Sequence, residues 1–319
     1  MTKRPVRPLR IVVIGCGDWG RKIAHNFLDL GALAGIVGRT PESLSELSWR
    51  LGVPSLSLND TLKSKEIDGV VIATPSSTHT ALAIKAINAK KHVLLEKPGA
   101  VDRSQLRALS EAASKSEGIF MGGHLLRYDP DFEALFEIVQ KGSLGRVRKI
   151  YITRTNQGKI RGDVGVMLSK GPHAISMLLA LTGQPPIKKQ VTVQRILNLD
   201  VEDAATLYLE FENDLSAEIS LSWLHPINRR ELVVICDHGM IVFDELKRRG
   251  QRLKIQQYHV KEPDTAPILK PEPPIYPVSS ESLPLARQCA HFLTCIERGH
   301  APLVGLVDIQ NVLRILLTE

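Results

Sequence analysis

The expected fold depends first on LRIVVIGCGDWG, residues 9–20, in which an apolar run leads directly into a glycine-rich turn. Ile11 to Ile14 are uninterrupted apolar residues, which is typical of a strand buried on both faces of a parallel sheet. The G-x-G-x-x-G pattern that follows allows a tight turn, lets the backbone approach a pyrophosphate and permits close helix–strand packing. Because the next dozen residues have helical spacing, the phosphates would face a helix N-terminus. The stretch favours dinucleotide binding over a merely structural turn. The predicted cofactor contacts here are Gly15, Gly17, Asp18, Trp19 and Gly20.

The rest of the first third alternates apolar and helical segments. Further strands are expected within residues 33–37, 68–75, 92–98 and 118–123, with helices between them. Alternation at this spacing predicts a parallel, doubly wound sheet. We therefore expect a dinucleotide-binding Rossmann domain over residues 1–122.

The pattern changes near residue 123. Asp129-Pro130 predicts a helix start, with Asp as the N-cap and Pro in the first turn. Apolar and polar residues then alternate in 206–211 and 215–223, and 231–245 resembles a hairpin. The predicted fold class is α/β: a Rossmann domain followed by a C-terminal α+β domain with a mainly antiparallel open sheet. Residues 123–319 would form this second domain, for substrate binding and oligomerisation.

Composition narrows the class of protein. The chain has 319 residues, and Lys plus Arg number 41 against 34 for Asp plus Glu. This mild basicity suits phosphorylated ligands, while no basic run with interleaved aromatics indicates nucleic-acid binding. The four cysteines form no C-x-x-C pair and no zinc pattern, so we expect reduced thiols in a cytoplasmic protein and no metal. No apolar stretch approaches the ~18 residues of a membrane helix, so no membrane partner is expected.

The end of the second expected strand reads Gly38-Arg39-Thr40, where an NAD site usually places a carboxylate on the adenosine ribose. The first carboxylate comes only at Glu42. Arg39 could pair with a 2′-phosphate or stack on adenine, which favours NADP. The alternative is that Arg39 is a solvated loop charge and NAD binds without the carboxylate. The choice between NAD and NADP stays open, with Arg39 and Thr40 as predicted contacts.

ATPSSTH, residues 73–79, ends another strand. Its hydroxyls and small residues lie at the carboxyl ends of the strands, where ligands bind in open α/β sheets. For His79, helix capping or a surface position is an equally good interpretation. The predicted cofactor contacts here are Thr74, Pro75, Ser76 and His79.

HVLLEKPG, residues 92–99, ends an apolar strand in two charges that are costly to desolvate. A dehydrogenase needs a base for the alcohol proton while hydride leaves for the nicotinamide. Lys97 beside the positively charged oxidised ring would have a lowered pKa, which suits a base or a proton relay. A salt-bridged surface lysine is the alternative. Glu96 either tethers Lys97 or touches the cofactor.

Two segments of the second half also carry polar groups. KGPHAISMLL, residues 170–179, places His173 at the opening of a helix, either as a catalyst or as a capping or core residue. TRTNQGKIR, residues 153–161, gathers three cations and Asn156 around a turn. Such a cluster could recognise a diphosphate, and a solvated basic loop is the simpler interpretation.

Residues 262–284 contain seven prolines and are expected to lack regular structure. They would form either an extended arm or lid, or a plain surface connection. Helices are expected around 285–298 and 307–318.

GCGDWG, ATPSSTH and HVLLEKP in this order resemble the glucose–fructose oxidoreductase / inositol dehydrogenase / MocA family, over nearly the whole chain. Within it, GHLLRYDP, TNQGKIR, GPHAIS, SWLHP and PLARQCAHF are similar to the branch that oxidises the 3-hydroxyl of UDP-N-acetylhexosamines. The resemblance implies oxidation of UDP-N-acetylglucosamine with NAD or NADP. The 3-keto product would feed an aminotransferase that makes a 3-amino sugar for lipid A or surface polysaccharide. It also implies a homodimer or homotetramer.

Residue by residue, the resemblance assigns the family's EKP lysine to Lys97 and its histidine to His173, which flank the reacting sugar carbon in the family. The Lys-Pro bond of that motif is often cis. A match to the G-K-I-R turn favours the diphosphate interpretation, and Pro226 and Arg229-Arg230 match a segment near the nucleotide. The basic cluster and the resemblance together predict these substrate-binding residues: Arg127, Tyr128, Arg154, Asn156, Lys159, Arg161, His173 and Trp223.

The chain departs from the family at two positions around the histidine. Many members carry a carboxylate four residues earlier, where this chain has Ser169, and often an Asp directly after it, where this chain has Ala174. A metal or a carboxylate-oriented histidine is therefore not supported. The alternatives that stay open are UDP-N-acetylglucosaminuronate as substrate, a free sugar or inositol, and a cofactor-binding regulator without catalysis.

Overall fold

The computed structural model describes residues 7–158, 160, 162–197, 200–261 and 268–317. The chain forms two compact units. Unit 1 combines Met1–Leu125 with Leu283–Glu319, and unit 2 is Leu126–Ser282. The units divide the chain differently from the expected domains, because the last segment joins the first unit rather than the second.

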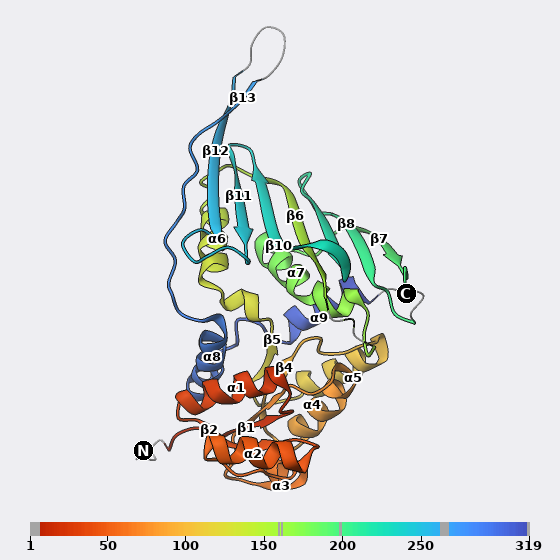
Figure 1. Cartoon of the computed structure of the whole chain (residues 1–319), viewed down its shortest axis with the longest axis vertical. Helices are drawn as coiled ribbons and strands as arrows, with labels where there is room; N and C mark the ends of the chain where they lie inside the picture. The colour runs from red at the N-terminus through yellow and green to blue at the C-terminus, as the bar shows by residue number, and fades with distance from the viewer. Residues whose placement is uncertain (1–6, 159, 161, 198–199, 262–267, 318–319) are drawn as a thin grey trace. The chain divides into compact units, whose positions relative to one another are not determined.

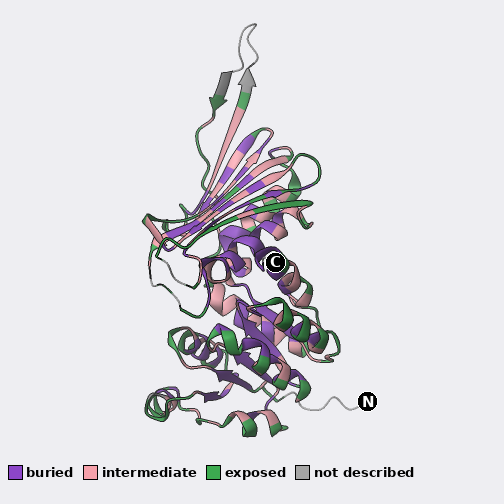
Figure 2. Cartoon of the chain, turned by 90° about the vertical axis from the view of Figure 1, so that its right-hand side faces the viewer, coloured by how far each residue is buried: buried purple, intermediate pink, exposed green. Residues whose placement is uncertain are grey.

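Unit 1 is built on a five-stranded parallel sheet in the order β2-β1-β3-β4-β5 (Figure 1). Every residue of the neighbouring strands β1 and β3 is buried (Figure 2), which explains their uninterrupted apolar sequences. The strand order reverses between these two strands, and ligands of open α/β sheets bind outside the carboxyl ends at such a point. The strands are β1 Ile11–Ile14, β2 Leu33–Val37, β3 Gly69–Ile72, β4 His92–Glu96 and β5 Phe120–Gly123.

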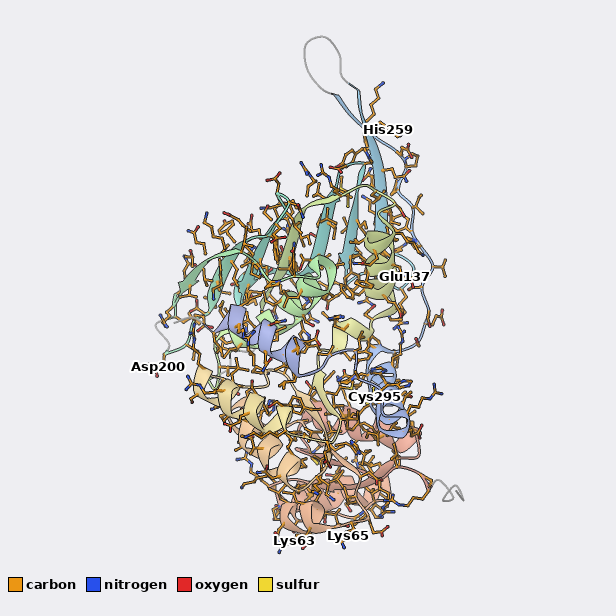
Figure 3. The ribbon with its side chains drawn as sticks, turned by 180° about the vertical axis from the view of Figure 1, so that it is seen from behind. Lys63, Lys65, Glu137, Asp200, His259 and Cys295 are labelled. Carbon is orange, nitrogen blue, oxygen red and sulfur yellow. The ribbon has the colours of Figure 1, made fainter. Side chains whose placement is uncertain are left out.

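Seven α-helices lie in the described part of unit 1, and two of them come from the end of the chain. Phe292 packs edge-to-face on Phe27, with ring centroids 6.3 Å apart. Cys295, labelled in Figure 3, is buried one turn further on. Ile309 fills the space above Gly99 and Gly122, where an added Cβ would come within 3.0 Å of it. The helices are α1 Asp18–Asp29, α2 Pro41–Leu51, α3 Leu58–Lys63, α4 His79–Asn88, α5 Arg103–Ser114, α8 Pro284–Arg298 and α9 Leu306–Leu316.

Unit 2 is built on an eight-stranded sheet in the order β13-β12-β11-β10-β6-β9-β8-β7. Among the described strands of this sheet, only β6 and β9 pair in parallel, so the sheet is mainly antiparallel, as expected. Helices α6 Pro130–Lys141 and α7 Val166–Thr182 cover one face (Figure 1), and alternate residues of the strands are buried there. The strands are β6 Val147–Gln157, β7 Lys188–Gln194, β8 Ala204–Glu210, β9 Ser216–Ser222, β10 Leu224–Cys236, β11 Gly239–Asp244, β12 Leu253–Lys261 and β13 Ile268–Pro271.

The proline-rich segment is more regular than its composition indicated. The expectation of no regular structure is wrong for β13, which pairs antiparallel with β12. An edge strand tolerates Pro271 because one side of its backbone needs no ladder partner. Further along, Arg249 donates to the main-chain oxygens of Ser280 and Ser282 at 3.0 and 3.1 Å. Residues 262–267 lie outside the described part of the chain.

No helix within the described residues combines the length and the apolar character needed to cross a bilayer.

Candidate active site

The glycine loop between β1 and α1 contains glycines of two kinds. Gly15 has a positive φ of 100°, and a Cβ there would come within 2.6 Å of the Ala73 carbonyl oxygen. A Cβ on Gly20 would collide with the main chain of Gly15. These two glycines are therefore required by the packing of the loop.

Gly17 differs from both. It has φ −70° and ψ −176°, a backbone conformation open to any residue. An added Cβ would meet no described atom within 4 Å apart from its chain neighbours. Folding therefore does not require glycine here, and its lack of a side chain leaves open space at the N-terminus of α1. Such a position suits the phosphates of a dinucleotide.

The end of β2 offers little to the ribose. Arg39 is exposed, and Thr40 is the N-cap residue of α2. Glu42, also exposed, follows in the first turn of α2. No carboxylate stands at the strand end itself, so these side chains alone do not choose between NAD and NADP.

The loop after β3 continues as a short 3₁₀ turn, Ser76–Thr78. The Thr78 hydroxyl donates to that of Thr74 at 2.7 Å, and Ser76 is buried. His79 is only 1% exposed, and its ring nitrogens lie 2.8 Å from the main-chain oxygens of Thr74 and Pro98. The ring therefore joins this loop to the turn after β4, instead of lying on the surface.

The turn after β4 carries the EKP motif. Glu96 is buried, Lys97 is half-buried, and the Lys97-Pro98 peptide bond is cis. The main-chain N–H of Lys97 donates to Oε2 of Glu96 at 3.3 Å. The family's cis bond is thus present in this chain.

Burial raises the pKa of Glu96, because a carboxylate is poorly solvated there. The Trp19 indole opposes the rise, followed by the charge and main-chain N–H of Lys97. No hydrogen bond of normal geometry joins Glu96 and Trp19, and Oε1 of Glu96 and Nε1 of Trp19 have no such partner among the described residues. The two buried polar groups therefore interact with each other near the glycine loop, at less than ideal hydrogen-bond geometry. The open space at Gly17, at the N-terminus of α1, fits the phosphates of a nicotinamide dinucleotide.

In unit 2, His173 lies inside α7, and the expectation that it opens the helix is wrong. The helix begins at Val166 and continues through Pro172. Glu202 caps its start, because its main-chain oxygen accepts from Val166 at 2.8 Å and its Oε1 accepts from Met167 at 3.0 Å. This cap comes from a distant segment, which no local sequence signal could show.

The basic turn after β6 divides into residues with different partners. Arg154 is buried and pairs with Glu245 through the two terminal nitrogens of its guanidinium group. Its charge is therefore largely compensated within the protein. The side-chain Oδ1 of Asn156 accepts from Lys170 Nζ. Lys159 and Arg161 lie outside the described residues.

Lys170 was missed by the sequence reasoning. It lies three residues before His173 on α7, so the two share a helix face. The signal in the sequence was a positively charged residue three positions before the predicted histidine, on the same helix face. The hydrogen bond of Lys170 to Asn156 places Asn156 beside the helix end that carries Lys170.

The remaining predicted residues lie elsewhere in unit 2. Arg127 and Tyr128 end a 3₁₀ turn, Leu125–Tyr128, and Tyr128 is buried. Trp223 is buried, and its main-chain oxygen accepts from Gly158 at 3.2 Å. Pro226, Arg229 and Arg230 are exposed on β10.

Two family models match this chain, one in its first part and one in its second part. The model of the GFO/IDH/MocA oxidoreductase family, with an NAD-binding Rossmann fold, matches residues 9–124. The model of the GFO/IDH/MocA C-terminal domain matches residues 132–242. Together the two models cover most of the chain.

Individual relatives agree with the family models. UDP-N-acetylglucosamine 3-dehydrogenase of Acidithiobacillus ferrooxidans is 30% identical over 216 residues, 67% of each chain. Myo-inositol 2-dehydrogenase of Thermotoga maritima is 28% identical over 185 residues, 55% of each chain. A solved structure of the Acidithiobacillus ferrooxidans enzyme superposes with a TM-score of 0.83 at 25% identity, over 97% of this chain and 95% of that one. With its Rossmann and C-terminal domains both matched, this chain belongs to the GFO/IDH/MocA family of oxidoreductases.

Proposed function

We propose that this oxidoreductase oxidises the 3-hydroxyl of UDP-N-acetylglucosamine to a ketone with NAD or NADP. The observation that carries the chemistry is the EKP turn. It places a half-buried lysine at the carboxyl edge of a sheet whose glycine loop leaves room for a pyrophosphate. The likeness to a UDP-N-acetylglucosamine 3-dehydrogenase over two thirds of each chain supports the substrate.

The cofactor, when bound, accepts hydride. The proposed residues that hold it are those of the glycine loop, with Gly17 nearest the phosphates, and Arg39 and Thr40 at the ribose. Thr74, Pro75 and Ser76 line the loop after β3. Glu96 and Trp19 add buried polar groups beside the glycine loop.

Lys97 is proposed to take the proton of the 3-hydroxyl, as a base or as the first member of a relay. His173 would polarise the same hydroxyl. At the two positions near this histidine where many family members carry a carboxylate, four before and one after it, this chain has Ser169 and Ala174. Lys97 is therefore the stronger candidate for the base.

The proposed contacts to the nucleotide lie in unit 2. Arg154 is the weakest of them, because Glu245 already pairs with its guanidinium. Lys170 is added as a cation beside Asn156. The other proposed contacts are Arg127, Tyr128, Asn156, Lys159, Arg161 and Trp223.

A 3-keto sugar nucleotide is a substrate for transamination. The proposed place of the reaction is therefore before an aminotransferase that makes a 3-amino sugar for lipid A or surface polysaccharide. We also propose a homodimer or homotetramer, on the basis of the family resemblance, and a place in the cytoplasm, on the basis of the four cysteines and their spacing.

Oxidation of a free inositol is the second candidate. It is favoured by the likeness to myo-inositol 2-dehydrogenase and by the compensated charge of Arg154. A free inositol would need none of the cations around the turn after β6.

The deciding experiment is a thermal-shift panel that crosses NAD and NADP with UDP-N-acetylglucosamine, its uronate, UDP and myo-inositol. Absorbance of the reduced cofactor then measures turnover for each pair. A shift with UDP and turnover with UDP-N-acetylglucosamine are expected. Turnover with inositol and no UDP-induced shift would favour the second candidate, and silence with every sugar would favour a regulator.

A further inference from the structure

The turn after β4 has a buried main chain whose polar groups are bonded by side chains. Pro98, Gly99 and Ala100 are all buried. The Thr80 hydroxyl donates to the Gly99 oxygen at 3.1 Å, and Val101 N–H donates to the Gln105 side chain at 3.3 Å. The turn is therefore held from α4 and α5 by a set of specific bonds.

His79 is the member of this set that spans two loops. Its Nδ1 lies 2.8 Å from the Pro98 oxygen, in the turn after β4. Its Nε2 lies 2.8 Å from the Thr74 oxygen, in the loop after β3. With the ring 1% exposed, water does not replace either partner.

The two acceptors constrain the protonation of the ring. A main-chain carbonyl oxygen can only accept, and a neutral imidazole has a single N–H. In the neutral form, one ring nitrogen would direct its lone pair at a carbonyl lone pair 2.8 Å away. The imidazolium instead donates from both nitrogens, and such charge-assisted bonds are roughly twice as strong as neutral ones.

The position of His79 in the chain makes this arrangement costly without its acceptors. His79 is the first residue of α4, where the helix dipole disfavours a positive charge. Burial of a cation is also unfavourable unless it is fully bonded. The two carbonyl oxygens supply that compensation.

We infer that His79 is held as an imidazolium that clamps the loop after β3 to the turn after β4. It is a positioning residue, since it contacts the main-chain oxygen of Pro98, the residue that follows Lys97. This inference rests on the proposed function for its catalytic consequence: the clamp fixes the place of the Lys97 main chain while cofactor and substrate bind.

The protonation is tested without any substrate. The full chain, labelled with ¹⁵N-histidine, is studied by long-range ¹H–¹⁵N correlation at neutral pH, and His79 is assigned by comparison with H79Q. Both His79 nitrogens are expected at the position of protonated nitrogens. His92 is the internal reference, because its Nδ1 accepts from Ile119 N–H at 2.9 Å and must be unprotonated. An unprotonated nitrogen in His79 would overturn the inference.

The clamp is tested by a pair of variants. H79Q is neutral and carries its donors on one nitrogen, so it cannot place a charged donor at each of the two carbonyl oxygens, and its kcat is expected to fall by about a hundredfold with a much smaller change in the KM for the cofactor. T80V removes one bond to the same turn but no bridge, and is expected to retain most of its activity. Equal kcat values for H79Q and T80V would overturn the positioning role.

The protonation of His79 and the proposed function can be refuted separately. A wild-type protein without sugar-nucleotide turnover would refute the proposed function and leave the His79 spectrum intact. If H79Q does not fold, the backbone-assigned spectrum of the wild-type chain still decides the protonation.

Discussion

Glu96 and Lys97 are adjacent in the sequence, but their surroundings differ. Glu96 is 5% exposed and has an elevated pKa caused mainly by burial. Lys97 is only half-buried and can face a ligand at the sheet edge. The strand end therefore separates a buried carboxyl group, whose pKa is raised, from a half-buried cation.

Replacement of Glu96 by Gln should raise the melting temperature at pH 8. The folded-state pKa of Glu96 is raised, so its contribution to the free energy of unfolding is complete below the ordinary carboxyl pKa. That contribution is lost as pH rises toward the folded value. Each kcal/mol gained corresponds to about 2–4 °C in a chain of this class. Differential scanning calorimetry without cofactor measures the gap, which should shrink toward pH 5.

Glu111 provides the control for this prediction. Lys115 bonds to it and lowers its pKa on the exposed surface of α5. E111Q should therefore melt no higher than the wild type at either pH. If E96Q melts below the wild type at pH 8, the account of Glu96 is wrong.

Replacement of Lys97 by Ala should remove turnover and leave cofactor binding intact. A positioned base or relay contributes about 10²–10⁴-fold to rate, so kcat should fall by that range. Stopped assays of cofactor reduction measure kcat. The fluorescence of the reduced cofactor measures its Kd for the protein. Lys115, the exposed C-cap residue of α5, gives a matched K115A control. Full activity in K97A would refute the assignment of Lys97.

At the scale of elements, different glycines of the loop from β1 to α1 serve packing and the proposed cofactor binding. Gly20→Ala should destabilise unit 1, because its Cβ meets the main chain of Gly15. Gly17→Ala should fold normally and weaken the cofactor by at least about tenfold, since its methyl enters space that no described atom fills. Thermal melts and cofactor titrations distinguish the two effects. A Gly17→Ala variant with wild-type affinity would place the phosphates elsewhere.

Helix α7 depends on a cap from outside its own sequence. Glu202→Ala removes the Oε1 acceptor of Met167 N–H and should cost about 1 kcal/mol. The melting temperature should then fall by about 2–4 °C. Because α7 carries His173, the KM for the sugar nucleotide should rise while the cofactor Kd is unchanged. The exposed Glu212 offers a control, E212A, and equal melts for both variants would refute the cap.

At the scale of the whole molecule, unit 1 is assembled from both ends of the chain. Phe292 packs on Phe27, and the main-chain oxygen of Val304 accepts from Gly122 at 2.9 Å. The sheet therefore depends on residues that follow unit 2 in the sequence.

A fragment of residues 1–122 should accordingly be unstable and bind no cofactor. Residues 1–125 joined to 283–319 by a flexible linker should fold cooperatively and bind NAD or NADP. Urea unfolding and cofactor titration of the two polypeptides check this. A cooperative transition in the short fragment would show that α8 and α9 are dispensable.

Much of the fold was predictable because it follows from local patterns. Buried parallel strands require continuous apolar residues, and the glycine spacing fixes the turn into α1. The hairpin over 231–245 and the last two helices were also predicted, as β10 with β11 and as α8 with α9.

The sequence by itself determined the Rossmann domain, the antiparallel second sheet and the EKP turn, because near neighbours in the chain set these conformations. The tertiary structure decided the partners of individual side chains. Arg154 meets Glu245 across 91 residues, Met167 meets Glu202 across 35, and His79 meets Pro98 across 19. Such pairs arise only when packing brings distant segments together, so charge compensation, helix capping and the loop clamp had no local signal.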